Sequence, residues 1–337
     1  MARVVMKDVA QHASVSRATV SNFLNNPELL SSATRARIAA SVETLSYVPS
    51  EAARKLRKSE NTTIGFLAFE VSDPDFGAVA DAVERQAQLA GWQVMIGNAL
   101  GSVDREREYL ELFERQRVGG IIVAPIGDVE DQLRGMRERG TRSVIVGRKA
   151  KVDEQPSVSY DDEAGGYQAV RHLLDLGRQR IAFIGGPFQV AQVNDRFQGA
   201  IQAVQETPGA TLEFVPIGDR SVRGGRSAGA QMLARGTTLP EGVFAVNDLV
   251  AFGVMQSFQS NGISIPSDVA VIGFDDFDLD ESAAVPLSSI RTPHDAIGEA
   301  AFNLVRGNPV TGHDHAENGS VQFIFQTELI ARESTVG

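Results

Sequence analysis

The apolar positions of the first fifty residues recur at helical spacing, and no stretch there alternates like a strand. This pattern predicts one helix over Met6–Ala13 and a second over Arg17–Asn25, with Ser16 suited to cap the second. Val20 and Leu24 lie one turn apart and point inward. The outward face of the second helix is therefore polar or very small throughout.

A third helix is predicted to start after a cap at Ser31 and to end before Pro49. A further short stretch, Ser50–Arg57, has room for one or two helical turns before a polar link. The apolar stripe of the third helix is formed by Ile38, Val42 and Leu45.

The pattern changes at Ile64. Short β-branched and aromatic runs now alternate with longer amphipathic patterns, which predicts parallel sheets joined by right-handed crossover helices. Two groups of such units, residues 62–160 and 161–290, each match one open α/β lobe. The remaining tail adds a strand, a helix over Asp295–Val305 and a last strand over Val321–Thr327, so we expect the backbone to cross between the lobes several times.

Charge divides the chain at the same place. The 337 residues carry a net charge of −11, yet residues 1–58 hold nine basic and four acidic side chains. That segment is therefore at +5 and the rest of the chain at −16. A basic N-terminal unit on an acidic body indicates a head that binds a polyanion, with chance clustering at a terminus as the alternative.

The two short helices and their three-residue turn have the layout of a helix-turn-helix, in which the second helix enters the major groove of DNA. Ala18 and Ser21 are small enough for close approach, and Arg17 and Asn22 are long enough to reach base edges. By pattern alone the evidence is moderate, because many three-helix bundles bind no DNA.

The chain resembles the LacI/GalR family of bacterial repressors over nearly its whole length, with motifs in the expected order and spacing. The stretches that carry the resemblance are Lys7–Ala10, Val15–Ser21, Leu24–Asn25, Ser31–Ile38, Tyr47–Pro49, Ala52–Leu56, Glu106–Leu110, Gly119–Ile122, Gly177–Gly186, Ala245–Asp248, Val271–Asp276 and Glu328–Ser334.

The resemblance implies an α/β fold class: an all-α helix-turn-helix headpiece followed by a two-lobed, periplasmic-binding-protein-like body with parallel sheets. We expect the headpiece at residues 1–49 and a hinge helix and linker at 50–61. The N-terminal lobe should comprise residues 62–160 and 291–319, and the C-terminal lobe residues 161–290 and 320–337.

The family's function is sequence-specific DNA binding, usually repression of a catabolic or transport operon, by a homodimer on a near-palindromic operator of double-stranded DNA. Arg17, Ala18 and Asn22 fall at its base-reading positions, and Leu56, with Ala53 beside it, matches the hinge leucine that wedges into the minor groove. The positions that match its phosphate contacts are Ser16, Thr19, Ser21, Asn25, Ser31, Thr34 and Tyr47.

The same resemblance implies a small-molecule effector, a sugar or sugar derivative, in a cleft between the lobes. Loops at the carboxyl ends of parallel strands are where such lobes bind ligands. The positions that match are Phe76, Arg148, Tyr160, Arg196, Arg220, Asn247, Asp275 and His294.

This chain departs from the family at three positions. Val5 replaces a capping Thr before the first helix, at a predicted cost of about 1 kcal/mol. Gly147 replaces a hydroxyl-binding Asp, and Thr292 replaces a Gln found in several sugar binders. Three arginines in one cleft would favour an acidic or phosphorylated ligand.

Two rival functions fit less well. A Rossmann-type enzyme needs a Gly-rich turn after the first strand, and Glu70–Gly77 contains none. A stand-alone solute receptor would not explain the basic head or the lack of a signal peptide. Cysteine is absent, and the only close histidine pair is His313 and His315 in a polar loop. We therefore expect no catalytic residue, cofactor or metal, no membrane span, and a cytoplasmic location.

Overall fold

The structure is a computed structural model that describes residues 4–47, 61–310 and 321–336. The chain divides into two compact units, Met1–Asn61 and Thr62–Gly337. The hinge positions Ala53 and Leu56, the Ser50–Arg57 helix and the two loop histidines lie outside the described residues.

The headpiece consists of helices α1 (Met6–His12), α2 (Arg17–Asn25) and α3 (Ser32–Thr44), with a 3-10 turn, η1 (Pro27–Leu29), between the last two. The hydroxyl of Ser16 accepts the Thr19 amide at 3.0 Å, and that of Ser31 accepts the Thr34 amide at 3.3 Å. Each cap satisfies an amide that the first helical turn leaves unpaired. A compact core joins the three helices and contains Val9, Ala10, Ala13, Val20, Ile38 and Tyr47.

The sequence suggested that α1 has no N-terminal cap because Val5 replaces a capping Thr. The structure shows that one of the two hydrogen bonds of a capping box is nevertheless present. Val5 has no side-chain acceptor, but its own amide donates to the Asp8 carboxylate at 2.8 Å. This is the return bond of a capping box. The Asp8 carboxylate also lies in the first turn, where it interacts favourably with the helix dipole.

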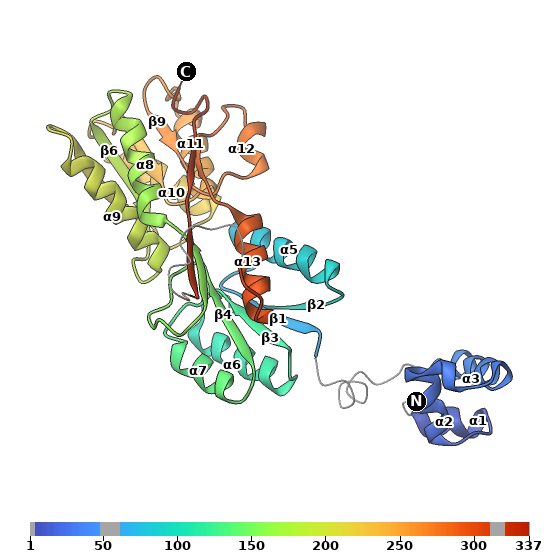
Figure 1. The fold of residues 1–337 in the computed structure, drawn as a ribbon. Helices are drawn as coiled ribbons and strands as arrows, with labels where there is room; N and C mark the ends of the chain where they lie inside the picture. The colour runs from blue at the N-terminus through green and yellow to red at the C-terminus, as the bar shows by residue number, and fades with distance from the viewer. Residues whose placement is uncertain (1–3, 48–60, 311–320, 337) are drawn as a thin grey trace. The chain divides into compact units, whose positions relative to one another are not determined.

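The first lobe of the body is a six-stranded sheet of order β11-β5-β4-β3-β1-β2 with every described pair parallel. Its strands are β1 (Thr63–Ala68), β2 (Gln93–Asn98), β3 (Gly120–Val123), β4 (Arg142–Val146), β5 (Ser157–Tyr160) and β11 (Gln322–Phe325). Its helices are α5 (Pro74–Leu89), α6 (Val103–Arg115), α7 (Glu130–Glu138) and α13 (His294–Arg306). Figure 1 shows α6 and α7 on the face of the sheet opposite α5 and α13.

The second lobe is a four-stranded parallel sheet of order β7-β6-β8-β9. Its strands are β6 (Arg180–Gly185), β7 (Thr211–Pro216), β8 (Gly242–Ala245) and β9 (Ala270–Ile272). Its helices are α8 (Asp162–Asp175), α9 (Ala191–Gln205), α10 (Val222–Ala234), α11 (Asp248–Ser260) and α12 (Asp278–Ser282). A separate antiparallel pair, β10 (Ser289–Arg291) with β12 (Glu328–Ile330), completes the described strands.

One expected lobe boundary is wrong. We assigned all of residues 320–337 to the C-terminal lobe, but β11 pairs in parallel with β5 at the edge of the first sheet. Phe323 and Phe325 are buried there. Only the chain after β11 joins the second lobe, where Ser334 accepts the amide of Val271 through its carbonyl at 2.9 Å.

Helices α8 and α9 approach so closely that glycine is needed at the crossing. A Cβ on Gly199 would lie 1.9 Å from the carbonyl oxygen of Glu163, and one on Gly166 would lie 2.1 Å from that of Arg196. Both distances are too short for any other residue without movement of the backbone. This contact fixes the position of Arg196 on α9, the residue around which the site is built.

Candidate functional site

The cavity between the two lobes lies at the carboxyl ends of their parallel strands, where open α/β sheets bind ligands. The space inside it is about 320 Å³, including open solvent at its mouth. The first lobe contributes Asp73, Asp75, Phe76 and Tyr160, and the second lobe contributes Gln192, Val193, Arg196, Arg220, Val246, Asn247 and Asp275.

Arg196 is the buried centre of the site, only 5% exposed. Its Nε donates to Asp162 at 2.8 Å, its Nη1 to the carbonyl of Val246 at 2.5 Å, and its Nη2 to the hydroxyl of Tyr160 at 3.2 Å. The guanidinium also stacks 3.5 Å from the centre of the Phe274 ring. Burial alone would lower the pKa of Arg196, but the Asp162 carboxylate and other nearby groups raise it above its usual value. Arg196 is therefore a fixed cation.

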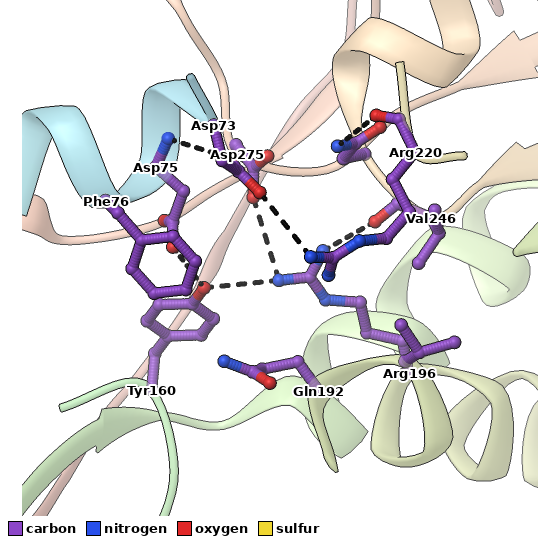
Figure 2. Close-up of a pocket in the computed structure, with 11 residues that line it drawn as sticks. Asp73, Asp75, Phe76, Tyr160, Gln192, Arg196, Arg220, Val246 and Asp275 are labelled. Carbon is purple, nitrogen blue, oxygen red and sulfur yellow. Dashed lines mark hydrogen bonds and ion pairs between the residues drawn. The ribbon is translucent and has the colours of Figure 1, made fainter. Parts of the chain in front are cut away.

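A hydrogen-bonded chain leads from Arg196 into the first lobe (Figure 2). The Tyr160 hydroxyl accepts from Arg196 and donates to Asp75 at 3.2 Å, and the other oxygen of Asp75 lies 2.9 Å from Nε2 of His294. Burial would raise the pKa of Asp75, yet its bonds to His294 and Tyr160 and the charge of Arg196 lower it on balance. Asp75 is thus held as a carboxylate.

Arg220 makes a second connection between the lobes. Its guanidinium is 3.9 Å from the carboxylate of Asp73 and lies 5.0 Å from the centre of the Phe69 ring. Asp73 caps α5 by accepting the amide of Asp75 at 3.2 Å. Burial and the nearby charge of Asp75 raise the pKa of Asp73 to about 6, although Arg220 opposes the rise.

Asp275 projects from the loop after β9 and is 2% exposed. Its backbone has a φ of 118°, a conformation that costs free energy for residues with a Cβ. Among the described residues, its Oδ1 accepts no hydrogen bond, and the nearest cation is Nη2 of Arg196 at 3.7 Å. Burial raises the pKa of Asp275 well above its usual range.

The structure brings six of the eight residues expected in the effector cleft to the cavity wall. These are Phe76, Tyr160, Arg196, Arg220, Asn247 and Asp275. His294 lies behind the wall, in contact with Asp75 and with its ring parallel to that of Phe277 at 6.2 Å. Asn247 is committed to the fold, since it caps α11 through the Val250 amide and donates to the carbonyl of Arg220.

Arg148 is not in the cavity wall, and that expectation is wrong. Its guanidinium binds Glu130 at 2.8 Å and the carbonyl of Gly127 at 3.2 Å within the first lobe. Bonds from Arg148 and from the Lys151 amide outweigh burial and lower the pKa of Glu130 to about 2. The case for an acidic ligand therefore loses one of its three arginines.

Two carboxylates of the first lobe were not among the expected site residues. Asp73 and Asp75 lie at the start of α5, in the connection that leaves the carboxyl end of β1, and this position could have identified them. Gln192 was also missed; it faces Gly147 across the cleft, where a Cβ on Gly147 would lie 2.9 Å from its Nε2. Val193 and Val246 are the other residues of the cavity wall that were not predicted.

In the headpiece, the expected DNA-contacting residues divide into two groups. Ser16, Arg17 and Ala18 are exposed at the start of α2, and Asn25 and Ser31 are exposed further along. Asn22, Thr19 and Thr34 are partly exposed. Ser21 and Tyr47, by contrast, are 6% and 7% exposed, so the expectation that Ser21 faces outward is wrong.

The described residues contain no helix long and apolar enough to span a membrane and no cluster of three metal-ligating side chains.

Comparison with known proteins agrees with this two-part architecture. Residues 5–50 match the model of bacterial regulatory proteins of the lacI family, and residues 170–335 match that of the periplasmic binding protein-like domain. The HTH-type transcriptional repressor PurR of Vibrio vulnificus (strain CMCP6) is 32% identical over 304 residues, which cover 89% of this chain and 90% of PurR.

Two solved structures have the same fold. A Lac repressor dimer bound to operator and the anti-inducer ONPF is 24% identical, with a TM-score of 0.80 over 100% of both chains. A LacI family transcriptional regulator from Enterococcus faecium with bound ribose is 28% identical, with a TM-score of 0.70 over 81% of this chain and 98% of that one.

A helix-turn-helix headpiece joined to a two-lobed body with a central cavity defines a DNA-binding transcription regulator that is controlled by a small-molecule effector. The chain belongs to the LacI/GalR family of bacterial regulatory proteins.

Proposed function

We propose that the chain is a repressor that binds a near-palindromic operator as a homodimer, and that a sugar or sugar derivative in the central cavity controls this binding. The observation that carries the proposal is a cavity whose polar walls come from both lobes, so that its occupant contacts both at once. A ligand of this kind binds one relative orientation of the lobes better than another.

The DNA-binding part of the proposal concerns the exposed start of α2. Arg17 and Asn22 read base edges, because both are accessible and long enough to do so, and Ala18 permits close approach of the helix. Ser16, Thr19, Ser31 and Thr34 contact phosphates near the N-termini of α2 and α3, which Ser16 and Ser31 cap. For the largely buried Ser21 and Tyr47 we now propose a role in positioning these groups.

The relatives support the assembly and the kind of effector. The Lac repressor in the solved complex is a dimer on its operator, and the Enterococcus faecium regulator holds ribose. We propose the same assembly and ligand class here, in the cytoplasm, with Leu56 and Ala53 of the linker at the operator centre. The relatives are regulators and not enzymes, and we assign no catalytic step to the cavity.

Selection of bound fragments from the genome of the source organism tests the proposal. The purified protein should recover a near-palindromic consensus, and Arg17→Ala should relax the preference at one symmetric pair of positions at a cost of about 1–3 kcal/mol. Thr34→Ala is the matched control, because loss of a phosphate contact weakens binding without changing the consensus. An unchanged consensus with Arg17→Ala would contradict the assignment of α2.

A further inference from the structure

The cavity contains more negative than positive groups. Counting the residues on and directly behind its wall, four carboxyl groups face two arginines and one histidine. From the first lobe come Asp73, Asp75 and His294, and from the second Asp162, Arg196, Arg220 and Asp275. With all four carboxyl groups ionised and all three basic groups cationic, these residues carry a net charge of −1.

Two of the three possible cations are already committed to groups of the protein. Arg196 donates to Asp162, to a backbone carbonyl and to Tyr160, and His294 lies on Asp75. This leaves Asp73 and Asp275 facing the cavity, with Arg220 near Asp73 at 3.9 Å. In Figure 2, dashed lines mark the ion pairs of Asp275 with Arg196 and of Asp73 with Arg220.

The lack of a hydrogen-bond donor is most pronounced at Asp275. Its Oδ1 is buried, lies in the cavity wall and accepts no hydrogen bond from a described residue. A buried acceptor without a donor costs free energy that a correctly placed ligand group recovers. Burial raises the pKa of both Asp73 and Asp275, although the charges of Arg220 and Arg196 oppose the rise.

We propose that the effector supplies the missing charge: it is a small polyhydroxylated molecule with one ammonium group, of the amino sugar class, and it is not an acid or a phosphate ester. The ammonium donates to Asp275 and Asp73 and so ties the ligand to both lobes. Arg220 and Gln192 are left to donate to its hydroxyl oxygens, and Phe76 provides an apolar wall for the ring. This inference rests on the proposed function, since it takes the cavity to be the effector site.

The test compares ligands that share one sugar ring and carry a hydroxyl, an ammonium or a carboxylate group. Glucose, glucosamine and glucuronate, with the corresponding galacto and manno series, are titrated calorimetrically into the full-length protein at pH 7.5. In at least one series the amine should bind about tenfold or more tightly than the neutral sugar, and the acid more weakly than both. Tighter binding of the acid or the neutral sugar, or no binding in any series, would overturn the proposal.

Asp275→Asn tests the charge without any ligand. Asparagine tolerates the same backbone conformation, so the variant replaces the carboxyl group and changes little else. Its melting temperature at pH 8 should rise by about 2–4 °C, and its preference for the amine should fall towards unity. A lower melting temperature would show that the protein already compensates this carboxylate, and the proposal would fail.

Asp276→Asn is the matched control, one residue along and also at positive φ. Its carboxylate is ion-paired with Arg291 at 2.6 Å and Arg332 at 2.7 Å. Neutralising Asp276 should therefore lower the melting temperature. Operator binding by the Asp275→Asn protein, measured in parallel, separates a failure of this inference from a failure of the proposed function.

Discussion

The guanidinium of Arg220, in the second lobe, lies 3.9 Å from the carboxylate of Asp73, in the first. Arg220 precedes α10 and Asp73 precedes α5. No nearby stretch of backbone joins the two residues, so the distance between their side chains depends on how far the lobes are closed. A ligand that favours closure strengthens this ion pair, and the ion pair in turn retains the ligand.

Arg220→Ala should therefore weaken effector binding by about 1 kcal/mol, mainly through faster dissociation, since both side chains are largely shielded from solvent. Stopped-flow measurement of ligand dissociation checks this. Arg223→Ala, exposed on α10, is the control. If Arg220→Ala slowed association and left dissociation unchanged, Arg220 would act by steering the ligand.

Removal of Arg196 should unfold the body more easily as well as abolish the effector response. Arg196→Ala would leave Asp162 buried without its cation, at a cost of about 3–5 kcal/mol. Differential scanning calorimetry should show a large loss of stability for the body. A variant as stable as the wild type would mean that the Asp162–Arg196 pair contributes little to folding.

Asp73 makes stability depend on pH in a defined direction. Its pKa is about 6 in the folded protein, above the ordinary value of 3.8, so the folded state binds this proton more tightly than the unfolded state. The contribution is favourable at low pH and is lost as the pH rises through about 6. Asp73→Asn keeps the α5 cap and should be more stable than the wild type at pH 7.5, by about 1–3 kcal/mol, with little difference at pH 4. Urea unfolding at the two pH values decides; equal stability at both would contradict this assignment.

Val5→Thr should stabilise the headpiece. A threonine hydroxyl at this position can accept the Asp8 amide and complete the capping box of which only the Asp8 half is present. A gain of about 0.5–1 kcal/mol is expected in the unfolding of the headpiece. Val5→Ala, which adds no acceptor, is the control, and an equal effect of both substitutions would rule out capping as the cause.

The elements of the fold could be predicted from the sequence because their signals are local. Ser16 and Ser31 cap the helices that were expected to follow them, and the alternation of runs after Ile64 gives parallel strands. The place of β11 could not be predicted in this way. The sheet that a short edge strand such as β11 joins depends on its pairing partner. That partner, β5, is more than 150 residues earlier in the sequence.

The site was predictable in part for a related reason. The family resemblance named Asp275 and Arg220, which follow strands and line the cavity, and the same position after a strand would have pointed to Asp73 and Asp75 had it been considered for β1. Arg148 has the right position after β4, but its side chain turns to Glu130 on α7. Only the tertiary structure shows whether the side chain of such an arginine points into the cavity or binds a neighbouring carboxylate of its own lobe.

The most direct test of the account measures the coupling between operator and effector from both sides. The affinity for operator is measured with and without a saturating effector, and the affinity for effector with and without operator, at fixed salt because phosphate contacts make binding salt-dependent. Because the coupling is reciprocal, both affinities should change by the same factor. The Asp275→Ala variant, which lacks effector contacts, should bind operator as tightly as the wild type, and its operator affinity should not change when effector is added. An operator affinity that is the same with the cavity empty and occupied would contradict it.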